Sequence, residues 1–328
     1  MHIVLLCGLL IALAIFFVYT FDALLLLFAG VLFALVLHAF CRFVARALHV
    51  PRPVALAGVV LLGVGVTVLL VVLFAPTAFG QFESLMQRLP DALRRLLARL
   101  DHARLTPGPV SSSQATSPSH KVQKALGDVV LGALGGSVEV AAGLAIIFFV
   151  GLYGAAQPQV YVRAALALTP ARERGRVQAA LHTTAEQLTR WLLGRLIAMA
   201  FVGITTAIAF QLLHLPMAIA LGVFAGLLTF IEYAGAVISA VPPLLLALAQ
   251  STTTALSVLV LYTALHLIEG YLLTPLLARA SVRVPPAIAL GAQVLLGTLV
   301  GPLGLTFSTP LLVVAISAVR AFREHDPA

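Results

Sequence analysis

The sequence has little charge and little cysteine, and both shortages narrow the classes of protein to consider. Only 10% of the 328 residues are charged and 61% are hydrophobic, whereas a soluble domain carries about 25% charged residues. Because so apolar a surface is not kept in water, lipid must be the solvent for most of the chain. The two cysteines, Cys7 and Cys41, form no C-x-x-C pair, so neither a disulfide framework nor a metal site is expected.

Signatures of soluble enzymes are also missing. The sequence contains no H-E-x-x-H, no G-x-S-x-G and no phosphate-binding G-x-x-x-x-G-K-[ST]. We therefore expect no enzyme, no cofactor and no ATP-driven pump. The net charge of +8 does not indicate nucleic acid, because the basic residues stand in short clusters between apolar runs, as they do in proteins oriented by a membrane.

Eight apolar stretches predict an all-α integral membrane protein. Two of them, Met217–Ala249 and Pro286–Val319, are too long for one span and short for two, and each has Gly and Pro near its middle. This composition predicts two re-entrant or broken-helix hairpins. The other six are of a length suited to single spans: Ile3–Thr20, Ala23–Phe40, Val54–Pro76, Val138–Gln157, Leu196–Leu213 and Ala255–Thr274.

Short connections predict the orientation. Loops near Thr20–Asp22, His214–Pro216 and Gln250–Thr254 contain no Lys or Arg. The positive-inside rule therefore places the opposite connections, the Arg-rich segment 158–195 and both termini in the cytoplasm of a bacterium, with the spans in its inner membrane. The opposite connections hold Arg42, Arg46, Arg52, Arg279, Arg283, Arg320 and Arg323.

Segment 77–136 is predicted to lie on the extracytoplasmic side of the membrane, as an amphipathic helix followed by a linker rich in Pro and Ser. Its first part has leucines at three- and four-residue spacing with arginines between them, which indicates an amphipathic helix. Such a helix lies on a membrane surface or packs on a partner; a plain solvated linker is the alternative. The predicted organisation is a three-span unit (1–76), this segment, a fourth span with its cytoplasmic connector (137–195) and a transport unit (196–328).

An internal repeat occurs in the C-terminal part of the chain. Pro216–Gly222 is similar to Pro285–Gly291, and the same offset pairs Gly235 with Gly304 and Ser239 with Ser308. Because the two hairpins enter from opposite sides, the units 196–250 and 255–320 form an inverted repeat, which in transporters places the substrate near the midplane. A chance match in a chain rich in Ala and Leu is the alternative.

Two carboxylates, Glu232 and Glu269, lie well inside apolar stretches, where a charge costs a few kcal/mol. His266 and Tyr262 share a helical face with Glu269, and a carboxylate and an imidazole at this spacing exchange a proton or hold a cation. The alternative is a Glu–His pair that only stabilises packing.

The helix ends at the two predicted breaks leave backbone N–H and C=O groups without helical partners. We expect the groups there to face a cavity and bind a polar solute, although close packing through small residues is the other interpretation. The residues concerned, beside Glu232, are Tyr233, Gly235, Gly301, Gly304 and Ser308.

Three motifs carry a family resemblance: Phe230-Ile231-Glu232-Tyr233-Ala234-Gly235, Ile268-Glu269-Gly270 and Gly301-Pro302-Leu303-Gly304. In this order they resemble the autoinducer-2 exporter family of bacterial membrane transporters. The resemblance implies export of a small signalling molecule in some members, sodium or proton antiport in others, and homo-oligomers, a pentamer among the options. Glu232 departs from the family, which usually has proline there.

The sequence thus predicts a secondary transporter of a small polar solute, coupled to protons or sodium ions. A sodium/proton antiporter without a signalling solute is one alternative. A non-transporting membrane scaffold that recruits partners through segment 77–136 is another.

Deleting residues 82–104 separates the scaffold from the transporters. A transport cycle housed in residues 196–328 should retain solute flux in proteoliposomes, because the deleted helix takes no part in it. Loss of function together with retained folding would instead support the scaffold.

Overall fold

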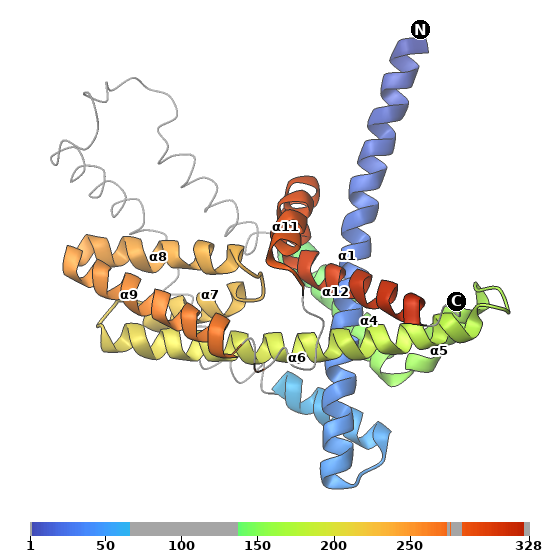
Figure 1. The fold of residues 1–328 in the computed structure, drawn as a ribbon, viewed down its shortest axis with the longest axis horizontal. Coiled ribbons are helices and arrows are strands. Elements are labelled where there is room, and N and C mark those ends of the chain that lie inside the picture. Colours follow the sequence, from blue (N-terminus) through green and yellow to red (C-terminus); the bar gives the residue numbers. More distant parts are fainter. Residues whose placement is uncertain (1, 66–136, 274–275, 277–283, 325–328) are drawn as a thin grey trace. The chain divides into compact units, whose positions relative to one another are not determined.

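The computed structural model describes residues 2–65, 137–273, 276 and 284–324 (Figure 1). Within these ranges every regular element is a helix, as predicted, and no strand occurs. The helices are Arg52–Gly65, α1 (His2–Leu48), α4 (Ser137–Ala156), α5 (Pro158–Ala167), α6 (Arg174–Leu212), α7 (Ala218–Leu228), α8 (Ala234–Gln250), α9 (Thr252–Ile268), the π-helix η1 (Glu269–Leu273), α11 (Pro286–Val300) and α12 (Pro302–Glu324).

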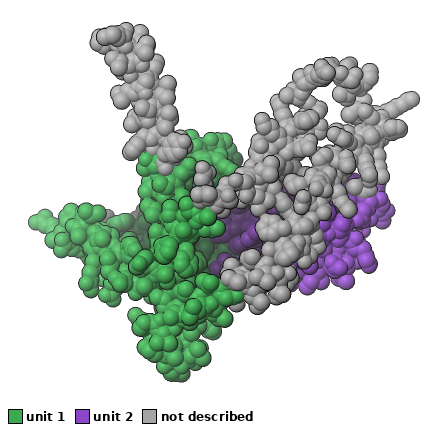
Figure 2. Space-filling model, turned by 180° about the vertical axis from the view of Figure 1, so that it is seen from behind, with its two compact units in different colours: residues 1–65, 141–195, 276–328 green, residues 66–140, 196–275 purple. Residues whose placement is uncertain are grey.

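The chain divides into two compact units (Figure 2). Unit 1 contains α1, most of α4, α5, α6 as far as Arg195, α11 and α12. Unit 2 contains α6 from Leu196, together with α7, α8, α9 and η1. This division is based on contacts within each unit and does not test the four-part organisation predicted from the sequence. Segment 77–136 lies outside the described residues.

The N-terminal helix α1 differs from the two predicted spans. It is uninterrupted over 47 residues, which corresponds to about 70 Å at 1.5 Å per residue, and it includes Thr20–Asp22, where we predicted a loop. That prediction is wrong, because no Gly or Pro occurs between Gly8 and Gly30 and Thr or Asp costs a helix only a few tenths of a kcal/mol. The predicted cytoplasmic N-terminus depended on two spans in this part of the chain. With one continuous helix that support is removed.

Two predicted spans, Val138–Gln157 and Ala255–Thr274, agree closely with helices, whereas Arg174–Leu212 begins well before the predicted start at Leu196. The described residues contain four helices long and apolar enough to cross a membrane, or five if the bent pair α4–α5 counts as one span. Their bounds are Thr20–Leu48, Arg174–Leu212, Thr252–Leu273 and Pro302–Phe322. The last of these lies in the second predicted hairpin, so half of that hairpin is itself long enough to span.

The two long apolar stretches, Met217–Ala249 and Pro286–Val319, are each divided into two helices. In unit 2 the break between α7 and α8 ends at Tyr233, and in unit 1 the break between α11 and α12 is at Gly301. Each break is followed by a glycine on which a Cβ would overlap a carbonyl oxygen of the preceding helix: Leu228 O at Gly235 and Leu296 O at Gly304. The same backbone approach therefore occurs in both halves of the sequence repeat.

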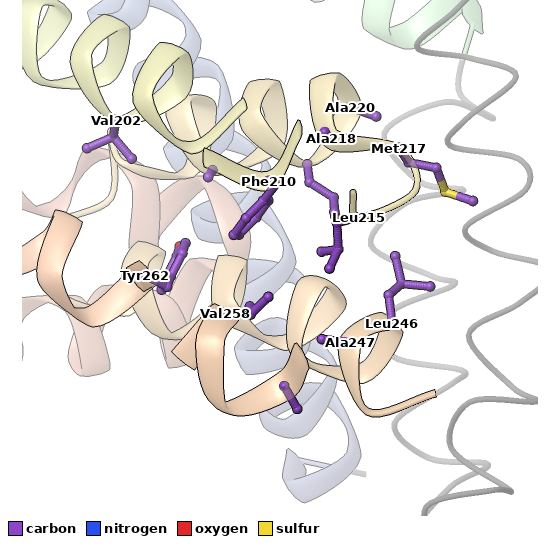
Figure 3. Packing of buried hydrophobic residues seen from close by; sticks show 13 residues of the cluster. Val202, Phe210, Leu215, Met217, Ala218, Ala220, Leu246, Ala247, Val258 and Tyr262 are labelled. Carbon is purple, nitrogen blue, oxygen red and sulfur yellow. The ribbon is translucent and has the colours of Figure 1, made fainter. Parts of the chain in front are cut away.

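The core of unit 2 packs α7, α8 and α9 beside the second half of α6 (Figure 1). Phe210 reaches from α6 toward Val258 and Tyr262 of α9 (Figure 3), and all three side chains are at most 5% exposed. Small residues allow the close approach of α6 and α7: a Cβ on Gly222 would lie 2.5 Å from Ala207 Cβ and 2.7 Å from Gly203 O. Such contacts between small residues hold helices together in lipid.

We expect Gly222→Ala to destabilise unit 2 by about 1–3 kcal/mol, because the added methyl overlaps α6. Gly291 is the repeat partner of Gly222, and a Cβ added to it would meet no atom within 4 Å. Gly291→Ala is therefore the matched control and should be neutral or slightly stabilising. Unfolding in mixed micelles checks both variants, and equal effects would contradict the close approach.

Candidate functional site

Three predicted residues of unit 2 lie together on one face of α9 and η1. The rings of Tyr262 and His266 are 4.5 Å apart between centroids, edge to face. His266 Nδ1 is 3.7 Å from Glu269 Oε2, and the two side chains are 17% and 14% exposed. This distance exceeds a hydrogen bond but permits an ion pair when the imidazole is protonated.

Tyr262 connects this pair to α8. Its hydroxyl is 2.5 Å from Ser239 Oγ, and Ser239 Oγ is 2.6 Å from the carbonyl oxygen of Gly235. Because the serine has one proton and donates it to this carbonyl, Tyr262 donates to Ser239. Both side chains are buried, Ser239 at 1% and Tyr262 at 5% exposure. A series of contacts, called the polar path below, thus runs from the break before α8 to Glu269: hydrogen bonds join Gly235, Ser239 and Tyr262, and a ring contact joins Tyr262 to His266. His266 in turn lies within ion-pair distance of Glu269.

Phe210 shields the middle of this path. Its ring stacks on Tyr262 with the centroids 6.3 Å apart, and its side chain is fully buried. An apolar neighbour strengthens the electrostatic interactions of the polar groups beside it, because less water screens them.

The helix changes its geometry at Glu269. Residues Glu269–Leu273 form a π-helix directly after α9, and short π-helical turns occur frequently at functional sites. In addition, His266 Nε2 is buried and has no hydrogen-bond partner among the described residues. A buried polar atom without a partner costs about 1–3 kcal/mol, so a polar ligand that reached this nitrogen would remove that cost.

The first break places Glu232 and Tyr233 between α7 and α8. Tyr233 has φ 56° and ψ −64°, and the N–H of Ala234 donates to the carbonyl of Glu232 at 2.6 Å. These values define a γ-turn of the rare, strained kind. Backbone strain of this sort clusters at ligand sites and switch regions. Tyr233 is 44% exposed and Glu232 is partly buried.

The second break, in unit 1, contains the other predicted residues. Gly301 has φ 73°, a conformation that favours glycine. Ser308 is fully buried and donates to the carbonyl of Leu305 at 2.8 Å. Ser239 has an equivalent contact to Ala236 O at 3.4 Å. The two serines therefore share a local contact as well as their place in the sequence repeat.

Sequence reasoning did not include Ser239 and Phe210 in the site. Ser239 carried a signal, since it matched Ser308 in the repeat, but its contact with Tyr262 crosses between two helices. No feature of the sequence indicated that Phe210 would lie beside the site. The described residues contain no group of three or more His, Cys, Asp or Glu side chains suited to a metal ion.

The fold and this buried polar path are those of a multi-helix membrane protein with ionisable groups inside its spans. The family description AI-2E family transporter matches residues 5–324. The chain therefore belongs to the AI-2E transporter family, in agreement with the resemblance seen in the sequence.

Three bacterial relatives, each named as a putative transport protein, are similar to the chain. YrrI of Bacillus subtilis (strain 168) is 31% identical over 48% of this chain and 46% of its own length. YueF of the same strain is 22% identical over 90% of this chain and 83% of its own length. YhhT of Escherichia coli (strain K12) is 26% identical over 42% and 39%. The chain thus matches less than half the length of YrrI and YhhT.

We expect Tyr262→Phe and Ser239→Ala each to destabilise unit 2 by about 0.5–1.5 kcal/mol, since each removes one buried hydrogen bond. A double-mutant cycle should give a coupling energy of about 0.5 kcal/mol or more. Tyr161→Phe is the matched control, because Tyr161 is 52% exposed. Additive effects in unfolding experiments would mean that the two hydroxyls do not interact.

Proposed function

We propose that the chain is a secondary transporter that exports a small polar solute, such as an autoinducer-2-like signalling molecule, in exchange for protons or sodium ions. The observation that supports this most is the partly buried His266–Glu269 pair, connected through Tyr262 and Ser239 to the helix break at Tyr233. Ionisable groups inside a span are costly and mark ion or proton pathways.

The proposed coupling begins at the pair. An imidazole and a carboxylate at this distance offer two sites for one proton or a joint site for a cation. Tyr262 contacts His266 and donates to Ser239, so a shift of the imidazole reaches the carbonyl of Gly235 through these two hydroxyls. The break then presents its backbone groups to the solute, with the N-terminus of α8 attracting partial negative charge.

Glu232, Tyr233 and Gly235 are the proposed solute contacts in unit 2. Gly301, Gly304 and Ser308 are the corresponding proposal for unit 1, in keeping with an inverted repeat of two re-entrant or broken-helix hairpins. We also propose the bacterial inner membrane as the location and a homo-oligomer as the assembly, as the family resemblance implies.

A sodium/proton antiporter is the second candidate, and one observation favours it. The carbonyls of Gly235 and Ala236 lie near the hydroxyls of Ser239 and Tyr262. Carbonyl oxygens at unwound helix segments coordinate sodium ions in transporters. In this case sodium would itself be the transported solute.

Flux in proteoliposomes with an imposed pH gradient tests both candidates. We expect Glu269→Gln to abolish gradient-driven flux while leaving downhill exchange measurable, because glutamine cannot carry the proton. Glu232→Gln tests the second carboxylate, and sodium and an autoinducer-2 mimic are the test solutes. Glu173→Gln, a carboxylate outside the spans with 47% side-chain exposure, is the control.

The solute that responds distinguishes the candidates. Flux of the mimic supports the exporter and flux of sodium alone supports the antiporter. Flux that is unchanged in both glutamine variants would reject coupling through these carboxylates, and no flux of either solute would support the scaffold.

A further inference from the structure

Unit 1 contains a cavity of about 760 Å³ that the proposed transport path does not use. It lies among α1, α4, α5 and the first half of α6, and all of its lining residues belong to unit 1. Its charged or titratable side chains are Arg42, Arg46, Arg190, His38, His182 and Glu186.

The cavity is positively charged. Glu186 is the one carboxylate among the lining residues, and it lies 4.0 Å from Arg190 and 3.9 Å from His182. Arg42 and Arg46 are both exposed, and neither forms an ion pair with a carboxylate in the described part of the chain. Since guanidinium groups stay protonated, three positive charges stand against one negative charge.

The surrounding helices indicate the depth of the cavity in the membrane. Arg42 and Arg46 are in the last two turns of α1, at the end of its apolar run. Helix α5 bends by 88° from α4 and has no buried residue. When α4 crosses the bilayer, α5 therefore runs along the surface, as interfacial helices do. In that arrangement the cavity opens at the level of the lipid headgroups.

Most of the remaining lining is apolar. Leu35 and Phe43 of α1, Val162 of α5, and Leu181 and Leu193 of α6 contribute to it. A soluble anion would gain nothing from these side chains, whereas a molecule with a charged head and a hydrocarbon body would use both kinds of surface.

We propose that this cavity binds an anionic phospholipid, with the headgroup phosphate at Arg42 and Arg46 and an acyl chain against the apolar lining. Arginine contacts phosphate oxygens through charge-assisted hydrogen bonds, and basic pockets between spans on the cytoplasmic side are known to accept anionic headgroups. The proposal does not depend on ion coupling at Glu269. Arg190, held near Glu186, contributes less of the positive charge.

The single tryptophan of the chain provides the measurement. Trp191 follows the lining residue Arg190 and is 8% exposed. In vesicles, brominated phosphatidylglycerol should quench its fluorescence at a lower mole fraction than brominated phosphatidylcholine, because bromine quenches only nearby indoles. The ratio of the two mole fractions at half quenching measures the preference for the anionic lipid.

The double variant Arg42→Gln/Arg46→Gln should reduce this preference by on the order of 10- to 30-fold, since each arginine near the surface contributes about 1 kcal/mol. The matched control is Arg172→Gln/Arg320→Gln, which removes the same charge from exposed residues outside the cavity lining and should retain most of the preference.

A second variant, expected to change the lipid preference in the opposite direction, tests the proposal if the arginine variant fails to fold. Glu186→Gln removes the only carboxylate of the lining and should raise the preference for phosphatidylglycerol. An unchanged preference in both cavity variants would overturn the proposal. So would relief of quenching by millimolar inorganic phosphate alone, because the site would then take a free anion.

Discussion

The fold depends on one constraint: backbone N–H and C=O groups within lipid must find partners inside the protein. Helices satisfy this by themselves, so the described chain is helical throughout and a break in a span is costly. At the break before α8, Gly235 N–H donates to Ile231 O at 3.1 Å and its own carbonyl accepts from Ser239. The break is therefore stabilised by a side chain as well as by the backbone. A movement of the Ser239 hydroxyl would alter its hydrogen bond to the Gly235 carbonyl.

Close helix packing makes this arrangement possible. Gly203 and Ala207 of α6 lie against Gly222 of α7, which allows α6 to bring Phe210 over Tyr262. The tyrosine is then buried with one good hydrogen-bond acceptor, Ser239. Phe210 therefore covers an aromatic ring whose hydroxyl is already hydrogen-bonded.

Charge has two different roles in the two units. In unit 2 the partly buried His266–Glu269 pair lies within a helix long and apolar enough to cross a membrane, and ionisable groups in such a position are typical of ion pathways. In unit 1 Arg42 and Arg46 lie near the end of α1 with apolar side chains beside them, and this suits the lipid surface. Neither arrangement contains the Cys, His and carboxylate geometry of a catalytic metal site among the described residues.

The sequence by itself determined the features that arise within a single helix. The helical class follows from composition, the breaks at Tyr233 and Gly301 from Gly and Pro, and the shared face of Tyr262, His266 and Glu269 from helical periodicity, because spacing along one helix decides these contacts. Only the tertiary structure decided contacts between helices. Ser239 meets Tyr262 across 23 positions, and the basic cavity combines α1 with α6. The continuity of α1 was missed because two polar residues at Thr20–Asp22 indicate a loop only when packing favours one.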